Sequence, residues 1–551
     1  MKQVVLVVAL MAAFGLMALD FSYAWCPSGG SMRLTPPPGR GDSESPGGAP
    51  GVQSGSARGL WETWWDTNKD KYLDYKKPFP REVFEVKVEG SSTESTELGM
   101  LRALFEQALK DGDFNIRLAA AIAIGRTGDI AYAQKLRPNL ADPEREVSDS
   151  TMLGIGMIKD TDSIQKIAEK LMDPKGHEVT RGFAAYALGY MRDPKAIDAL
   201  KKILDFKSED PQTLWACTLA LGLERDPALV PYVGEILLPK KGKKEDSTQK
   251  AYAALALGRL GGDEAMNLLI KAFDKEKDNE VLRSIAIGLG MIGNPGAKDT
   301  LVTMIKKGKD ELVRGFALIA LAQTKAEGSY EIMLECANDK KSDDFKAFGI
   351  IALGILNDAK AVPELKKVLA DKRAAEFVKN AALIALGMLK AKDTIKELMD
   401  IVKSVKESET KRDYTLIALG MIGDEIVVPE ITELFKNSDK TPNIYRDCCY
   451  SLAMLGQHKV VLEKMYKDYE GGNADIKALA VLVLGKIGDK GTVVFLKNRF
   501  EKETNKSNRL IIVASLGYLA DPNRITTLRE LTADNNYQIK FLSIDHVRQI
   551  P

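Results

Sequence analysis

Hydrophobic and polar positions follow a helical spacing along most of the chain, in a pattern that returns about every 33 residues. Each copy contains a segment shaped like Ala-Leu-Gly-x-Ile-Gly-Asp. Its first glycine lies at Gly125, Gly156, Gly189, Gly222, Gly258, Gly290, Gly354, Gly387, Gly420, Gly485 and Gly517, and Ala322 and Ala453 take that position in two more copies. Such a period is typical of a superhelical array of small units, so we expect an all-α solenoid of about thirteen two-helix repeats.

Each repeat is predicted to contain an outer and an inner helix, such as residues 194–204 and 213–223. An oxygen-bearing cap followed by proline marks outer-helix starts at Asp193, Asp226, Asn294 and Asp521. A second set of caps, for the inner helices, stands twelve residues before the repeat glycine: Asp113, Asp210, Asp246, Asp278, Asp310, Ser342, Ser408, Thr441, Asn473 and Asn505. Capping is therefore part of the repeat itself.

A row of cations stands eight residues before the glycine, one turn inside the inner-helix cap: Arg117, Arg181, Lys250, Arg314, Lys346, Lys379, Arg412, Lys477 and Arg509. We expect these side chains to contact the caps of neighbouring repeats. The alternative is a positive stripe that binds an anionic ligand. Exposed pairs of this kind contribute only about 0.2–1 kcal/mol each.

Methionine and aromatic residues share one face of the inner helix, six residues before and one residue after the glycine. They either fill the contact between stacked repeats or form an adaptable protein-binding surface. On the second interpretation, the partner-binding candidates are Phe183, Tyr190, Tyr252, Met291, Phe316, Phe348, Met388, Tyr414 and Met421. Burial of most of them between repeats would argue against such a groove.

The N-terminal region divides into three parts before the repeats. Residues 1–24 resemble an export signal, with Lys2, an apolar run from Val4 to Leu19 and a Ser-Tyr-Ala cleavage motif. Residues 25–57 are a Pro/Gly/Ser-rich linker that holds Cys26, which is free to pair or be modified. We expect a periplasmic or extracellular protein without stable membrane insertion after cleavage, because the apolar run is shorter than the ~20 residues that span a bilayer.

Residues 58–96 form a tryptophan-rich module, and residues 97–551 form the repeat array. Trp61, Trp64, Trp65 and Tyr72 share a helical face, which we expect to cover the open end of the array together with a strand at residues 83–88. Stacking on sugar rings is an alternative. A calcium loop starting at Asp66 is disfavoured, because lysines replace the glycine and the bidentate acid that it needs.

Composition excludes little but gives no support to catalysis. With 78 basic and 77 acidic residues, the balance offers no reason to expect nucleic acid as the main ligand. The three histidines and five cysteines do not form a zinc or haem motif. The cysteines in predicted helices are not expected to form disulfides, because those in different repeats are too far apart and adjacent ones point apart. Acidic residues are expected at caps and solvent faces rather than in a buried pair. An inserted loop at residues 240–244 is basic; it is either solvated or in contact with an anionic membrane or partner.

The two-helix unit with its Val313-Arg314 and Ala418-Leu419-Gly420 motifs resembles HEAT repeats of the phycobilisome-lyase-like type, from about Glu97 to the C-terminus. This resemblance implies an α-solenoid whose second helices line the concave side. The family includes scaffolds, adaptors and a few enzymes. One of these, deoxyhypusine hydroxylase, binds metals through several His-Glu pairs, whereas this chain has only His177-Glu178.

The sequence thus favours an exported, non-catalytic scaffold without a cofactor, which binds a protein partner along the concave face. Two alternatives remain. One is an envelope- or polysaccharide-binding module that uses the tryptophan helix, and the other is a lyase-like enzyme by analogy of fold.

Overall fold

The computed structural model describes residues 59–76, 96–206, 210–240, 246–438, 441–537, 539 and 542–550. The expected export signal, the linker with Cys26, the strand at 83–88 and residues 241–245 of the lysine-rich loop lie outside these ranges. The described residues form helices and short 3₁₀ turns, with no β-strand among them. None of the described helices is both long enough and apolar enough to cross a membrane.

Thirteen helical pairs make up the array. The inner helices are α5 (Phe114–Thr127), α7 (Arg145–Met157), α9 (Glu178–Met191), α11 (Pro211–Leu223), α13 (Ser247–Leu260), α15 (Asn279–Ile292), α17 (Glu311–Thr324), α19 (Asp343–Leu356), α21 (Glu376–Met388), α23 (Glu409–Ile422), α25 (Pro442–Met454), α27 (Ala474–Ile487) and α29 (Lys506–Ala520). The outer helices are α4 (Thr96–Ala108), α6 (Ala133–Leu136), α8 (Ile164–Met172), α10 (Pro194–Leu204), α12 (Val230–Leu237), α14 (Gly262–Phe273), α16 (Lys298–Lys307), α18 (Ser329–Ala337), α20 (Val362–Ala370), α22 (Ile395–Lys403), α24 (Val428–Lys436), α26 (His458–Gly471) and α28 (Lys490–Phe500). The expected all-α solenoid of two-helix repeats is confirmed.

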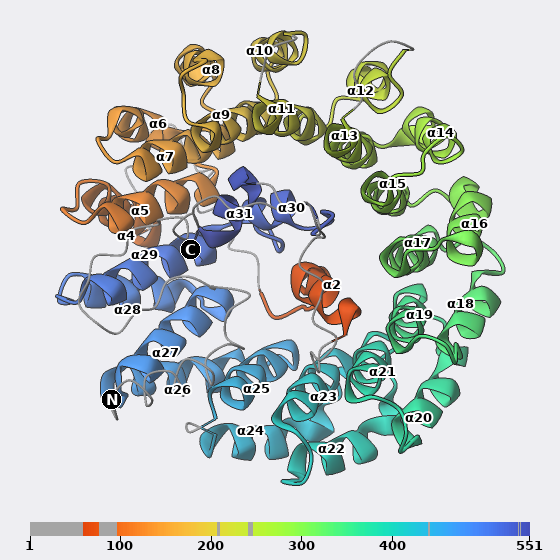
Figure 1. The fold of residues 1–551 in the computed structure, drawn as a ribbon. Helices are drawn as coiled ribbons and strands as arrows, with labels where there is room; N and C mark the ends of the chain where they lie inside the picture. Colours follow the sequence, from red (N-terminus) through yellow and green to blue (C-terminus); the bar gives the residue numbers. More distant parts are fainter. Residues whose placement is uncertain are drawn as a thin grey trace, which may run out of the picture.

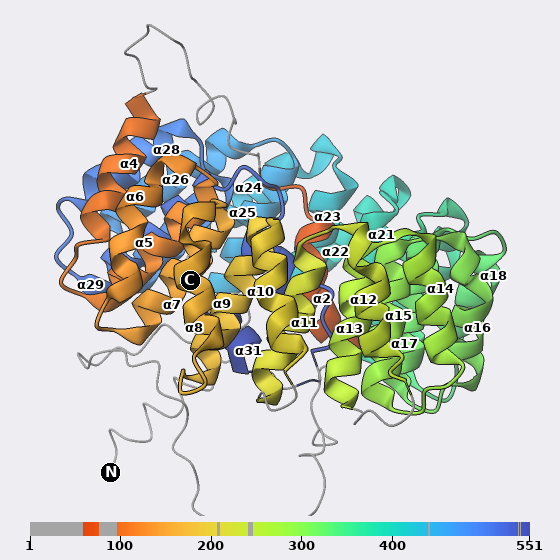
Figure 2. The same ribbon diagram turned by 90° about the horizontal axis from the view of Figure 1, so that it is seen from above.

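The solenoid closes into a ring, as Figure 1 shows. The last inner helix, α29, packs against the first, α5, and the last outer helix, α28, packs against α4. Seen from the side in Figure 2, the array is a low cylinder whose helices run along its axis. The inner helices surround the centre, and the outer helices form the rim.

The repeat glycine is required where successive inner helices touch. A methyl group on Gly189 would come within 2.6 Å of the carbonyl oxygen of Ala220, and one on Gly387 within 2.9 Å of the Cα of Ala418. The same contact closes the ring, since a methyl group on Gly517 would lie 2.5 Å from the Cα of Ala123. No side chain fits at this distance, so the spacing of the glycines sets the spacing of the helices.

Capping follows the sequence closely. Nine of the ten predicted inner-helix caps accept a backbone N–H through their side chains; Thr441 is an N-cap without this bond. Asp193, Asp226 and Asn294 cap outer segments as predicted. The prediction at Asp521 is wrong, because this residue ends α29 and the next helix, α30 (Thr527–Thr532), begins six residues later. Its carboxylate instead accepts the backbone N–H groups of Asn523 and Thr527.

Several cations of the predicted row join neighbouring repeats. Arg181 of α9 donates to Asp210, the cap of α11, at 2.8 Å, and Arg117 of α5 donates to Asp142 just before α7 at 2.8 Å. Others bind carbonyls within their own repeat, as Arg314 does with Ile305 and Arg412 with Val402. These contacts support the structural interpretation of the row over an anion-binding stripe.

Candidate functional site

The inner face of the ring is the predicted partner surface, and two segments of the chain itself lie against it. Helix α2 (Leu60–Asn68) and the C-terminal helices α30 and α31 (Leu542–Gln549) occupy the centre in Figures 1 and 2. We expected the tryptophan helix to cover an open end of the array. That expectation is wrong, because the array closes on itself and α2 packs on the inner helices α19 and α21 instead.

Helix α2 is held by its tryptophans and by its first turn. Trp61, Trp64 and Trp65 expose 5% of their surface or less. The Trp61 ring lies 5.6 Å from that of Tyr414 on α23, and its Nε1–H donates to the carbonyl of Phe377 on α21 at 2.9 Å. The backbone N–H of Leu60 donates to Asp344 in the first turn of α19 at 2.6 Å. The helix thus spans three successive repeats through aromatic contacts and anchored polar groups.

The C-terminal segment lies against the opposite part of the inner face. Tyr190 of α9 donates its hydroxyl to the carbonyl of Thr527 at 2.9 Å, and the Tyr186 and Ser543 hydroxyls lie 2.8 Å apart. Further along, the Tyr537 ring meets Phe316 of α17 edge-on at 5.5 Å. This segment therefore follows the inner helices from α9 to α17.

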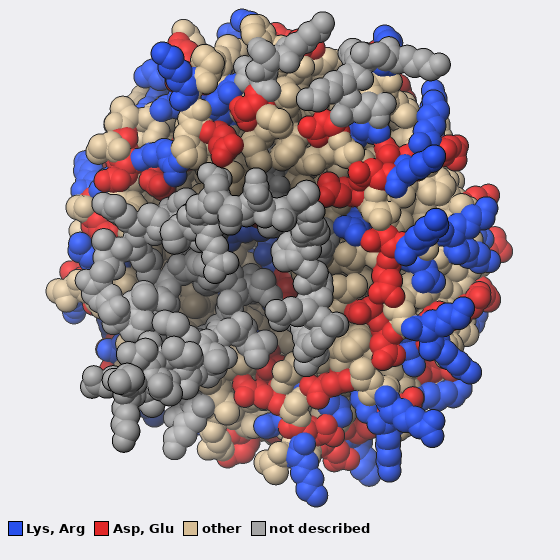
Figure 3. Space-filling model, in the orientation of Figure 1, with Lys and Arg blue, Asp and Glu red and all other residues tan. Residues whose placement is uncertain are grey.

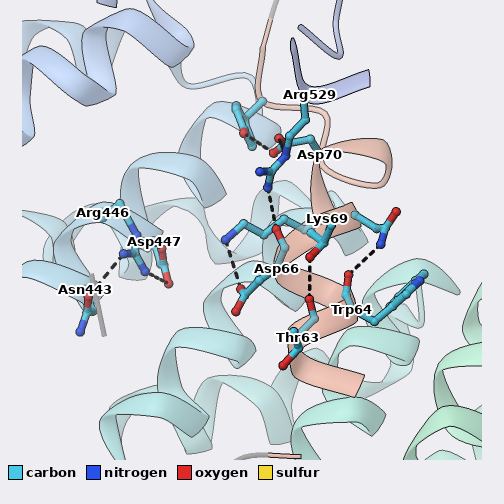
Figure 4. Close-up of polar contacts among 12 residues, drawn as sticks. Thr63, Trp64, Asp66, Lys69, Asp70, Asn443, Arg446, Asp447 and Arg529 are labelled. Atoms are coloured by element: carbon cyan, nitrogen blue, oxygen red, sulfur yellow. Dashed lines mark hydrogen bonds and ion pairs between the residues drawn. The ribbon is translucent and has the colours of Figure 1, made fainter. Parts of the chain in front are cut away.

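The two terminal segments also bind each other, as the close-up in Figure 4 shows. Arg529 pairs with Asp70 at 3.0 Å and donates to the carbonyl of Asp66 at 2.6 Å, while Lys69 pairs with Asp66 at 3.4 Å. The carboxylates of the disfavoured calcium loop thus face cations of the protein. Together the segments form one plug, which we define as residues 59–76, 521–537, 539 and 542–550.

The structure places the nine partner-binding candidates in two kinds of contact. Tyr190, Phe316 and Tyr414 contact the plug directly. Tyr252 and Phe183 are buried, with 3% of their surface exposed. The methionines instead lie over the glycine of the preceding repeat: side-chain atoms of Met291, Met388 and Met421 face Gly258, Gly354 and Gly387, and Phe348 packs over Gly315. The face is therefore partly inter-repeat packing and partly a surface that the chain itself covers.

A pair of acids on this face was not expected. Asp447 of α25 is buried and accepts the Arg446 guanidinium at 2.7 Å, while burial and the charge of Asp447 hold the pKa of Asp413, on α23, well above its ordinary value. One carboxylate oxygen of Asp413 is buried without a hydrogen-bond partner. The expectation that acids lie only at caps and solvent faces is wrong, because aspartates also occupy inward positions of these inner helices. Sequence could have shown it: both aspartates stand in the first half of an inner helix, seven and six residues before the position of the repeat glycine.

A second polar cluster lies where the ring closes. The Tyr518 ring of α29 has Lys76 Nζ at 5.0 Å, the Arg126 guanidinium at 5.6 Å and Lys486 Nζ at 5.9 Å from its centroid. Lys76 also donates to the carbonyls of Asp521 and Asn523 at 2.9 and 3.0 Å. Residues of the first repeat, the last two repeats and both ends of the plug meet at this point. The sequence signal is a pair of cations, Arg126 and Lys486, at the position after the repeat glycine, where seven other copies carry methionine or tyrosine.

The cavity described at the centre of the ring is small. It has a volume of about 20 Å³, enough for about one water molecule, and lies between Trp64, Asn68 and Phe316. Among the described residues, no three His, Cys, Asp or Glu side chains converge as metal ligands. Cys217, Cys336, Cys448 and Cys449 are buried free thiols.

Comparisons with known proteins agree with the repeat assignment. The family of HEAT repeats matches residues 164–241 and 237–322. Among solved structures, human deoxyhypusine hydroxylase is 19% identical and covers 49% of this chain and 98% of its own, with a TM-score of 0.23. The complex of CpcE and CpcF of phycocyanin lyase from Nostoc is 20% identical and covers 54% of this chain and 97% of its own, with a TM-score of 0.27. At these TM-scores neither likeness carries an argument about function, and no curated protein sequence matches the chain. This chain thus contains HEAT repeats, and its fold is an α-solenoid of such repeats.

Proposed function

We propose that this protein is an exported, non-catalytic scaffold that binds a protein partner at the inner face of its ring, in competition with its own helix α2. The observation that carries the proposal is the docking of α2, a helix outside the repeats, on three inner helices: Trp61 contacts α21 and α23, and the backbone N–H of Leu60 donates to Asp344 of α19. The inner face therefore has the shape and chemistry to bind an aromatic-bearing helix. A partner helix with apolar side chains at the same spacing fits the same surface.

The composition of the face supports this role. Aromatic side chains provide large contact areas with few rotatable bonds, and they are enriched where proteins bind each other. The export part of the proposal rests on the N-terminal sequence, and no nucleic acid is proposed because the charge balance gives no basic domain.

The two alternative functions receive less support. Sugar stacking needs an accessible aromatic face, whereas the three tryptophans of α2 are buried against the ring. A lyase-like enzyme rested on analogy of fold, and the central cavity described above holds about one water molecule.

Weakening the docking of α2 in the full-length chain tests the proposal. Trp61→Ala removes a fully buried side chain and costs about 3–5 kcal/mol of docking, so capture of a partner from the native envelope fraction should rise about tenfold or more. A peptide of residues 58–76 should compete with that capture, and the same peptide with Trp61→Ala should not.

A matched control separates this effect from general destabilisation. Phe435→Ala also removes a fully buried aromatic ring, but on outer helix α24, where Phe435 packs against Tyr445 rather than α2. The control should leave capture unchanged. If capture responds to neither Trp61→Ala nor the peptide, the partner binds elsewhere and the proposal is wrong.

A further inference from the structure

One axial face of the ring carries a crescent of lysines that the sequence motifs did not reveal. They stand in or next to the loops that lead from an outer helix to the next inner helix. We call this set the basic rim: Lys275, Lys277, Lys306, Lys307, Lys309, Lys340, Lys341, Lys372, Arg373, Lys403, Lys406 and Lys436, all exposed. Because every such loop lies at the same end of its repeat, the array brings these cations to one edge of one face.

On this face, basic side chains lie nearer the outer edge of the ring and acidic side chains lie nearer its centre. Figure 3 shows blue side chains along the outer edge and a row of red side chains between them and the centre. Inner helices begin at this face, and their first turns carry acids such as Glu311, Asp343 and Glu409. Within the described residues, no ion pair joins an acidic side chain to the cations of the rim's middle: Lys306, Lys307, Lys309, Lys340, Lys341 and Lys372. The middle of the rim therefore presents positive charge that no ion pair in the described part of the chain neutralises, whereas Lys403 and Lys436 at its end pair with Glu430 and Glu433.

Among the described residues, the exposed apolar side chains Val405 and Phe206 lie on this face, whereas Ile130 and Ile426 lie at starts of outer segments on the opposite face. Val405 is 89% exposed in the loop after α22, between Lys403 and Lys406. Phe206 is 62% exposed after α10, at the equivalent point of an earlier repeat. Val405 thus lies among rim cations, an arrangement typical of surfaces that contact the headgroup region of a bilayer, whereas Phe206 lies two repeats before the first of them.

The opposite axial face differs in charge. Outer helices begin there, and their starts carry acidic caps such as Asp193, Asp226, Asp358 and Asp424. Cations on that face, for example Lys195 and Lys360, stand beside these acids. The two faces of the ring are therefore not equivalent toward an anionic surface.

The N-terminal part of the plug begins at the basic face. Leu60 N donates to Asp344 in the first turn of α19, and inner helices begin at this face. Lys240, at the start of the inserted lysine loop, also follows the outer helix α12 at this face and is exposed. The described end of the lysine loop and the end of the N-terminal segment thus share one side with the rim.

We propose that the basic rim docks the ring, with this axial face down, on an anionic membrane surface. Lysine predominates over arginine in the rim, which suits attraction to lipid headgroups more than the bidentate contacts typical of specific nucleic-acid or carboxylate recognition. A crescent at one edge of a flat face meets a planar surface with many charges at once. The valine and phenylalanine reach the headgroup region, and the opposite face stays in water.

Vesicle binding of the full-length chain tests this. We expect it to bind vesicles of phosphatidylcholine with about one-third phosphatidylglycerol more tightly than pure phosphatidylcholine, with the difference lost at 1 M salt, where the Debye length falls to about 3 Å. Reversing three rim charges, Lys307→Glu, Lys341→Glu and Lys372→Glu, should lower the anionic-lipid partition coefficient by about tenfold or more. Val405→Ser should lower it by severalfold without changing its salt dependence.

The matched control reverses three exposed charges on the opposite face: Lys195→Glu, Lys360→Glu and Lys490→Glu, each at the start of an outer helical segment. It should bind like the native chain, because the net charge change is the same and only the face differs. Equal loss in both triple variants would show a net-charge effect and overturn the proposal. Indifference to anionic lipid would overturn it as well, and so would tighter rim-dependent binding to single-stranded DNA or an acidic peptide, which would assign the rim to another class of ligand.

Discussion

The seam between the last and first repeats and the interfaces inside the array differ in one respect: only the interior interfaces join repeats that are consecutive in the chain. Their contacts are otherwise alike. Gly517 meets Ala123 as Gly387 meets Ala418, and Arg509 pairs with Asp111 at 2.7 Å as Arg283 pairs with Asp310 at 2.5 Å. Lys506 adds a contact to Asp113, the cap of α5, at 3.4 Å. The first repeat therefore accepts the last one through the same surface by which it would accept a preceding repeat.

This likeness explains why the solenoid closes. In a linear array each repeat contacts only its neighbours, and the terminal repeats must hide an apolar face. Here the two terminal faces hide each other, and the plug joins them where Lys76 reaches the carbonyls after α29. The seam holds without a peptide connection, so it should be the interface whose failure changes the shape of the molecule.

The largest effect is expected from overpacking the seam. Gly517→Val places a side chain where even a methyl group lies 2.5 Å from Ala123, and it should cost about 3 kcal/mol or more. The ring should open, which small-angle X-ray scattering detects as a larger radius of gyration. Gly387→Val meets a similar obstacle but joins repeats that the chain connects, so it should lower stability in urea while the ring stays closed. Equal scattering profiles for the two variants would contradict this distinction.

The pH dependence of the free energy of unfolding should also distinguish the seam from the interior of the array. Burial lowers the pKa of Lys76, at the seam, from 10.5 to about 8, and burial raises the pKa of Glu224, at the end of α11, from 4.5 to about 8. Between pH 8 and 10.5 the unfolded state binds more protons at Lys76, so stability rises with pH. Between pH 4.5 and 8 the folded state keeps the proton on Glu224, so stability falls with pH. Each slope is at most about 1.4 kcal/mol per pH unit.

Two neutral substitutions check these slopes in urea titrations. Lys76→Met should flatten the alkaline side, and Glu224→Gln should flatten the range between pH 4.5 and 8. Hydrogen exchange adds the location, because the Lys76 effect should appear in α5 and α29 and the Glu224 effect in α11. A flattened acid range in the Lys76 variant would contradict the assignment.

The smallest effect is expected from single ion pairs. Arg509→Ala and Arg283→Ala each remove a pair whose side chains are 11–21% exposed, so each should cost about 1 kcal/mol, and less at high salt. Hydrogen exchange should show faster opening of α29 and α5 after Arg509→Ala only. If the hydrogen-exchange rates of α5 and α29 are the same in both variants, the seam pair has no special role.

Much of the local structure could be predicted from the sequence. The boundaries of α10 and the end of α11 match the predicted helices, and the caps from Asp113 to Asn505 hold with one exception in their bonding. These features depend on neighbours within a few residues, so a repeated motif reports them directly. The prediction that Asp521 caps an outer helix was wrong because its contacts depend on the plug. Its neighbours in space include Lys76, which is far away in the sequence.

The candidate site was predicted only in part. The sequence identified the face that carries Tyr190, Phe316 and Tyr414, but it did not show that Thr527, Tyr537 and Trp61 lie against it. The pair of Asp447, which is buried, and Asp413, which is half-buried, was missed because burial depends on which face of the helix turns inward. The basic rim was missed because its cations are spread over several offsets from the repeat glycine, in or next to the loop that leads to the inner helix, and do not form one row.

The sequence by itself determined the unit: two capped helices, a glycine where helices touch, and a cation one turn inside the inner helix. These are local choices, and each copy repeats them. Only the tertiary structure decided that thirteen units close on themselves, that α2 and the segment after α29 occupy the centre, and that the lysines line one edge. Ring closure depends on small angles summed over all the repeats, and a single motif does not encode that sum.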